Sequence, residues 1–189
     1  MAISAISLCS RALLKIGAGS ISSFADGTVE AEMAANLYPG IRDGLLSAHP
    51  WSFATAQASL PRMEAEPVAD FKYAFMLPTD FLRVISAGAG KKGRGLDYRI
   101  EERRLHCNST SVMLSYIFRP KEENFPAFFD MALCARLAAE FCIPLTESSS
   151  RAEFLLKVAE DLFRQAKVID GQQDIPLAIE HFPLLEVRQ

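Results

Sequence analysis

Ser10-Arg-Ala-Leu-Leu-Lys-Ile-Gly17 completes the first helical pattern of this chain of 189 residues. Apolar side chains recur along that pattern at steps of three and four, at Ile3, Ile6, Cys9, Leu13 and Ile16. After a short polar link, a second pattern has steps of four, at Val29, Met33, Leu37, Ile41 and Leu45. Each spacing predicts a helix with one apolar stripe. We expect the two stripes to bury each other in an antiparallel helix pair.

His49-Pro-Trp51-Ser-Phe53 follows the second helical pattern. Pro50 cannot continue a helix, and the Trp51 and Phe53 rings offer a large apolar area at a turn. We therefore interpret Trp51 and Phe53 as a structural latch that closes the helix pair. Inside the second pattern, Pro39 predicts a kink, because proline removes a helical hydrogen bond.

The period of the pattern changes to two in the middle third of the chain. Apolar side chains alternate with others from Phe71 to Leu77, and further strands are expected at 82–85 and 112–118. A hairpin is expected between Tyr98 and Cys107. Together these segments predict a small antiparallel sheet inserted between two helical pairs.

A glycine-rich segment, Gly88-Ala-Gly-Lys-Lys-Gly-Arg-Gly95, lies within this middle third. Two of its glycines have the spacing of a phosphate-binding loop, but Arg94 and Gly95 stand where that loop needs a lysine and a hydroxyl residue. No helix follows to direct its N-terminus at a phosphate. We interpret the segment as a mobile hairpin tip that carries Lys91, Lys92 and Arg94.

The last third returns to helical patterns. A helix is expected to start near Asn124 and to end at Pro144, and a second helix to start with Ser150-Arg-Ala-Glu153 and to end at Gly171. The expected fold class is therefore mainly α: an antiparallel helical bundle with an inserted small antiparallel β-subdomain and an extended C-terminal tail. Its four parts have these expected boundaries: N-terminal helical hairpin 1–60, β-subdomain 61–120, C-terminal helix pair 121–171, and extended docking tail 172–189.

Composition excludes several classes of function. The formal net charge of −3 and the pI of about 5.7 argue against a protein that wraps DNA tightly. The four cysteines form no Cys-x-x-Cys pair, and the three histidines have no acid or second ligand at helical spacing. We expect no catalytic residue, no cofactor and no metal site, hence no enzyme. No signal peptide and no membrane span are expected either.

The tail after Gly171 is apolar and interrupted by Pro176 and Pro183. It is too apolar for a solvated disordered end and too rich in proline for a long helix. We expect it to dock on a neighbouring chain, with its own subunit as the alternative. The candidate docking residues are Ile175, Leu177, Ile179, Phe182, Leu184 and Leu185.

Four segments in this order resemble one family, the tail tubular protein A or head-to-tail adaptor (connector) proteins of tailed bacteriophages. The first is the helical hairpin that ends in Trp51-Ser-Phe53, and the second is the strand Tyr73-x-Phe75-x-Leu77-Pro78-x-Asp80-x-Leu82-Arg83-Val84. The third is the Tyr98-x-Ile100 hairpin with Leu105, and the last is the helix pair from Phe125 to Gly171. Each motif alone is moderately specific, but together they cover nearly the whole chain. The chain departs from the family pattern at Pro39-Gly40 and in its apolar tail.

The resemblance implies a structural virion protein without catalytic activity. Several copies, a dodecamer in this family, would form a ring between the portal protein and a downstream tail or nozzle protein, and the viral genome would pass through it during ejection. The tail would dock on the portal or a neighbour, and Lys91, Lys92 and Arg94 would contact the tail or the DNA in the lumen, transiently and without sequence specificity. The protein would reside in the host cytoplasm before assembly and at the head-tail junction of the virion afterwards.

Two other classes of function remain open on the sequence. A helical ligand-binding or regulatory module would line a pocket with the helix between Phe125 and Phe141 and would show convergent polar groups there. A small hydrolase would need a nucleophile, a base and an orienting acid within reach of one another. The sequence shows no such trio.

Overall fold

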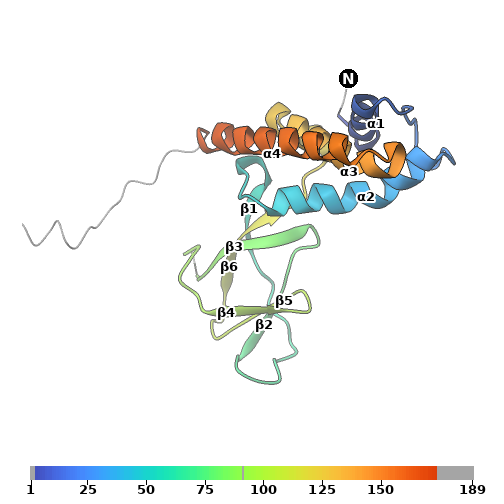
Figure 1. Ribbon diagram of the computed structural model, residues 1–189. Helices are drawn as coiled ribbons and strands as arrows, with labels where there is room; N and C mark the ends of the chain where they lie inside the picture. Colours follow the sequence, from blue (N-terminus) through green and yellow to red (C-terminus); the bar gives the residue numbers. More distant parts are fainter. Residues whose placement is uncertain (1–2, 91, 174–189) are drawn as a thin grey trace, which may run out of the picture.

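A computed structural model describes residues 3–90 and 92–173 of the chain (Figure 1). In Figure 1 the helices lie together on one side of the molecule and the strands on the other. The helices are α1 (Ala5–Ile16), α2 (Val29–Ser47), α3 (Ala127–Thr146) and α4 (Ser149–Gly171), with two short 3₁₀ turns, η1 (Ser52–Ala54) and η2 (Glu122–Asn124). The strands are β1 (Thr55–Ser59), β2 (Tyr73–Met76), β3 (Phe81–Ala89), β4 (Tyr98–Glu101), β5 (Arg104–Cys107) and β6 (Val112–Phe118).

Local sequence explains where α1 and α2 begin and where α1 ends. Ser4 caps α1 in a reciprocal pair with Ser7, and Gly17 ends the helix in the left-handed region at φ 79°. Thr28 caps α2 by accepting a hydrogen bond from the Ala31 amide at 3.2 Å. The helix continues through Pro39 to Ser47 without interruption.

The two C-terminal helices differ slightly from their predicted bounds. The expectation that Pro144 ends α3 was wrong, because the helix runs on to Thr146. The Thr146 hydroxyl donates to the Cys142 carbonyl at 2.7 Å, and a proline this close to the end removes only one helical hydrogen bond. Glu147 then ends α3 at φ 53°, and Ser148 caps α4.

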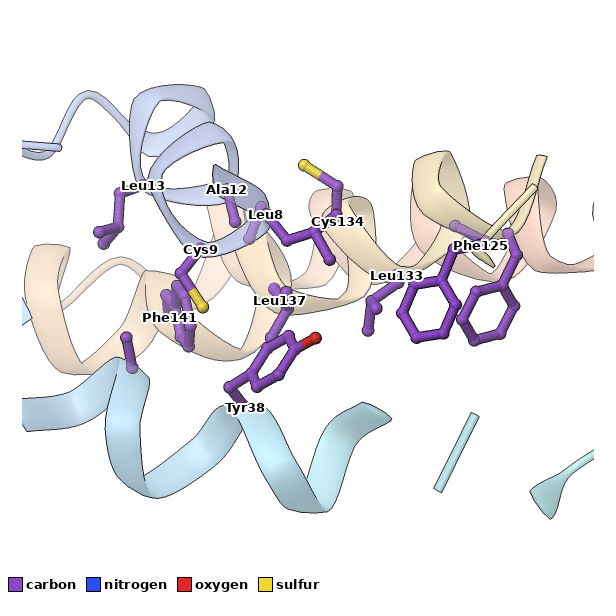
Figure 2. Packing of buried hydrophobic residues seen from close by; sticks show 14 of the residues in the cluster. Leu8, Cys9, Ala12, Leu13, Tyr38, Phe125, Leu133, Cys134, Leu137 and Phe141 are labelled. Atoms are coloured by element: carbon purple, nitrogen blue, oxygen red, sulfur yellow. The ribbon is translucent and has the colours of Figure 1, made fainter. Parts of the chain in front are cut away.

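Helix α3 is the centre of the helical layer, and α1, α2 and α4 all pack on it. The sequence predicted that α1 and α2 bury each other, but α1 packs mainly on α3 and touches α2 only lightly. Figure 2 shows why: Leu8 and Cys9 of α1 and Tyr38 of α2 all point toward the side chains of α3. These helices share one core, whose largest fully buried side chains are Trp51, Phe129, Phe141, Leu8, Leu13, Leu46, Leu133, Leu137 and, from strand β6, Ile117.

The strands form two three-stranded antiparallel sheets, in the orders β1-β6-β3 and β2-β5-β4. They enclose a second apolar core between them, separate from the helical one. Its buried members are Leu60, Phe75, Leu77, Ala87, Leu105, Cys107, Val112, Leu114 and Tyr116. A β-bulge in β3 shifts its register against β6 between Val84 and Ser86.

The expected fold class was wrong. The described residues form an α+β mixture, 47% helix and 20% strand, rather than a mainly helical bundle with a small inserted sheet. The main reason is β1, whose sequence Thr55-Ala-Gln-Ala-Ser59 lacks the alternation of large apolar residues that signals a strand. By pairing with β6 it completes a sheet of its own, so the strand region forms a second layer with its own core.

Candidate functional site

Trp51 lies where the two layers meet. Its side chain is 0% exposed and its indole nitrogen donates to the Leu45 carbonyl at 3.0 Å. The indole contacts Phe129 and Phe163 edge-on, at centroid distances of 5.2 and 5.6 Å, and Phe53 packs against Phe129 at 5.1 Å. The two latch residues thus join α2, α3 and α4 through one aromatic cluster.

Asp170, near the end of α4, holds the latch segment from the other side. This carboxylate is 3% exposed and accepts two hydrogen bonds from Ser52, one from the amide at 3.0 Å and one from the hydroxyl at 2.7 Å. His49 Nε2 lies 3.6 Å from the same carboxylate. Burial lowers the pKa of His49, and it outweighs the opposing effect of the Asp170 charge. The segment 49–52 therefore bridges the C-terminal ends of α2 and α4.

An open groove of about 510 Å³ runs between α2 and α4, with α3 as its floor. Small residues create the space on every wall: Gly40, Gly44 and Ala48 on α2, Ala132 on α3, and Ala159 on α4. The larger apolar side chains on the walls are Leu37, Ile41, Leu45 and Phe163. We call this space the α2–α4 groove.

The α2–α4 groove also contains three charged side chains. Arg136 and Glu140, one turn apart on α3, pair with each other at 2.7 Å, and Glu160 lies on the α4 wall. Because the arginine and Glu140 already satisfy each other, the groove offers mainly apolar surface. The groove is suited to bind an apolar segment of a protein.

The glycine-rich segment folds back over β3 instead of projecting as a tip. The Ser86 hydroxyl donates to the Gly93 carbonyl at 2.7 Å, and the Leu96 amide donates to the Ala87 carbonyl at 3.1 Å. A Cβ added at Gly88 would lie 2.0 Å from the Lys92 carbonyl oxygen, so this position has room only for glycine. Lys92 and Arg94 are exposed on the folded loop. Lys91 lies outside the described residues.

Charge is distributed unequally between the two layers. Residues 55–119, which include all the strands, contain ten Lys and Arg against seven Asp and Glu. The rest of the chain contains ten Lys and Arg against sixteen Asp and Glu. The strand layer is thus the one part with an excess of positive charge, and Lys92 and Arg94 belong to it.

The structure therefore brings Trp51 and Phe53 together, and it places Lys92 and Arg94 in the other layer. The predicted docking residues Ile175, Leu177, Ile179, Phe182, Leu184 and Leu185 lie outside the described residues. Sequence reasoning missed the α2–α4 groove and the Asp170 contacts. Gly40 and Gly44, spaced four apart in the second helical pattern, were the available signal for the groove.

The cysteines are buried, and burial sets their chemistry. Desolvation raises the pKa of Cys9 to about 12 and also raises the pKa of Cys134. These thiols stay protonated at neutral pH.

Within residues 3–90 and 92–173, no group of three His, Cys, Asp or Glu side chains is placed to hold a metal ion. No helix in the same part of the chain is long and apolar enough to cross a membrane.

Comparison with known proteins gives no assignment: no protein-family model matches the chain, and no curated protein matches it significantly.

Proposed function

We propose that the protein is a head-to-tail adaptor of a tailed bacteriophage, a structural subunit of a ring between the portal and the tail. The observation that carries the proposal is the open apolar α2–α4 groove beside a latch whose sequence, Trp51-Ser-Phe53, is part of the family resemblance. An open apolar groove is a typical surface for binding another protein segment. A ring of identical subunits needs such surfaces on every copy.

The exposed apolar side chains of the helical layer support the same proposal. Phe154, Val168 and Ile169 of α4 are 65%, 61% and 44% exposed, and Ile143 of α3 is 56% exposed. Large apolar side chains left in water are typical of surfaces that become covered on assembly. In the proposed ring, these side chains and the tail face the portal or adjacent subunits, and a downstream tail protein binds on the other side.

The positive excess of the strand layer supports a weak contact with the passing genome. Lys92 and Arg94 would face the lumen or the downstream tail protein and would make screened phosphate contacts without reading sequence. The ring would thus let DNA pass without binding it tightly. No enzymatic step, cofactor or metal is part of this proposal.

The test is to mix the full-length protein with the portal protein encoded in the same genome and to examine the particles by electron microscopy. The expected result is a ring of extra density on one face of each portal, with twelve subunits. Portal particles that stay bare at high adaptor concentration contradict the proposal. Salt titration of DNA binding by the isolated protein should show only weak, strongly salt-dependent affinity.

A helical ligand-binding module is the second candidate, because α3 does line the α2–α4 groove as that alternative requires. Its polar groups would have to converge on a ligand, whereas Arg136 and Glu140 pair with each other. Small apolar compounds that raise the melting temperature of the wild type, and not of a Gly44→Leu variant with a filled groove, would favour this module over the adaptor.

A further inference from the structure

We propose that the α2–α4 groove of one subunit binds the C-terminal segment 174–189 of a neighbouring copy of this chain. The inference deepens the proposed function, and it rests on that function for the presence of adjacent copies. It names the occupant of the groove and pairs two surfaces of the same chain in a head-to-tail contact.

Length and pattern match between the groove and the tail. The α2 wall runs from Leu37 to Ala48, which is about 16 Å at the helical rise. In the tail, Ile175, Leu177 and Ile179 alternate with Pro176 and Ala178, so that an extended chain carries three apolar side chains on one face over about 13 Å. An extended segment therefore fits along the groove and can place its apolar face on the small residues of the walls.

The position of the latch favours a neighbouring copy over the same chain. Segment 49–52 crosses from α2 to Asp170 of α4, and Trp51 lies against Phe163 at the last position of α4 that lines the groove. The latch thus closes the end of the groove next to the point where the described chain stops, at Gln173. A tail entering its own groove would have to reverse over this bridge within a few residues, and Pro176 favours an extended residue before it. The tail of another copy needs no reversal.

The groove is open in the folded subunit and can be filled by mutation. A Cβ added at Gly40 or Gly44 meets nothing within 4 Å, so side chains introduced there enter the groove without displacing any described part of the chain. Gly44→Leu also replaces a residue of poor helix propensity with a good one. We therefore expect this variant to block the groove without disturbing the fold.

The test uses a synthetic peptide of residues 172–189 with Ile179→Cys, and full-length protein with Ala48→Cys. Ala48 is exposed and lines the groove, while the native cysteines of the described chain are buried. Under mild oxidation the peptide should form a disulfide with the Ala48→Cys protein. It should not form one with the matched control Asn36→Cys, which places the thiol on an exposed part of α2 outside the groove. Adding Gly44→Leu should abolish the capture.

A second measurement separates the neighbour from the chain itself. A full-length double variant, Ala48→Cys with Ile179→Cys, should form few intramolecular disulfides when diluted and should form covalent multimers when concentrated. Dominant intramolecular disulfides at high dilution, or a peptide that is captured equally by the Asn36→Cys control or by neither protein, overturn the inference. Portal rings that form while the peptide is not captured reject the groove and leave the adaptor proposal standing. A peptide that is captured while portal particles stay bare supports the groove contact and rejects the adaptor proposal.

Discussion

The helical layer and the strand layer are built in different ways. In the helical layer, contacts join residues far apart in the chain: Arg11 of α1 pairs with Asp130 of α3 at 2.7 Å, and Ser52 is held by Asp170. In the strand layer, backbone ladders make most of the contacts: β1 pairs with β6 and β2 with β5 across long stretches of the chain, and β4 and β5 form a hairpin. The helical layer also contains the aromatic cluster and the groove, whereas the strand layer has the excess of positive charge.

This difference suggests a division of roles within the subunit. The long-range contacts make the helical layer one cooperative unit, so a change at its centre affects the stability of the whole chain. The strand layer has a core of its own, so changes at its surface should have little effect on the helical layer. If this division holds, substitutions at the centre of the helical layer reduce stability more than substitutions at the surface of the strand layer.

Trp51→Ala tests whether the aromatic cluster holds the helical layer together. Removing this fully buried ring should lower the free energy of unfolding by about 3–5 kcal/mol, which is close to the whole stability of a marginal domain. Urea denaturation followed by circular dichroism measures it, with Trp51→Phe as the milder control. A variant that melts within a few degrees of the wild type would show that the latch contributes little.

Asp170→Ala removes the acceptor that holds the latch segment against α4. Ser52 is exposed, but two of its hydrogen bonds to this buried carboxylate are lost, and hydrogen bonds to charged groups contribute about 1.5–3 kcal/mol. The matched control is Asp161→Ala on the same helix, where an exposed pair with Arg164 is lost at little cost. Equal midpoints of chemical unfolding for the two variants would mean that the latch does not depend on Asp170.

Gly88→Ala tests the strand layer. The added Cβ would lie 2.0 Å from the Lys92 carbonyl oxygen, so the glycine-rich segment must move off β3. Because this loop is at the surface and can shift, we expect a cost of about 1–2 kcal/mol. Hydrogen exchange should increase in β3 and the loop and stay unchanged in α3. Gly93→Ala is the control, since its Cβ would make ordinary contacts, with the Ser115 hydroxyl at 3.6 Å and the Gln57 side-chain nitrogen at 3.9 Å. Faster exchange throughout the helices would contradict the division of the two layers.

The helices of the helical layer were easier to predict from the sequence than the strands of the strand layer. The apolar steps of α1 and α2 predicted both helices, and in α1 the predicted stripe is largely buried, because a helix that buries one face carries a visible stripe. In α2 the predicted stripe was wrong as the buried face: Val29 is 69% exposed, and the buried residues are Ala31, Ala34, Tyr38 and Leu46. The partner of either helix was not predictable, since a stripe says that a face is buried and not against which helix. In the strand layer, β1 was missed because alanine, serine and threonine alternate too weakly to signal a half-buried strand.

The candidate site was even less visible in the sequence. Trp51 stood out by its size and by its place after a proline. The α2–α4 groove arises from small side chains on three separate helices, at positions such as Gly44, Ala132 and Ala159. A single sequence does not show which small residues face one another. Asp170 gave no signal at all, because an acid at the end of a helix is usually solvated.

His49 gives the helical layer a small pH dependence. Burial lowers the pKa of its imidazole in the folded state below the unfolded value of about 6.5, so protonation favours unfolding. The contribution of His49 to stability is complete above that value and is lost as the pH falls through the folded pKa. Chemical denaturation of the wild type and of His49→Gln, compared between about pH 7 and pH 5, should show a smaller decline in the variant. Parallel declines would show that the imidazole does not contribute.

Truncation after Gly171 should have the smallest effect on stability and the largest on assembly. The last described helix ends at Gly171, and the core residues of the described chain all lie before it. We therefore expect the melting temperature to stay nearly unchanged, while rings on portal particles are lost. A full-length Leu177→Asp variant is the matched control for chain length, and it should assemble as poorly as the truncated protein, because a charge cannot enter the apolar groove. A truncated protein that unfolds would place the tail in the core of its own subunit. One that still assembles would move the docking surface to the exposed apolar side chains of α3 and α4.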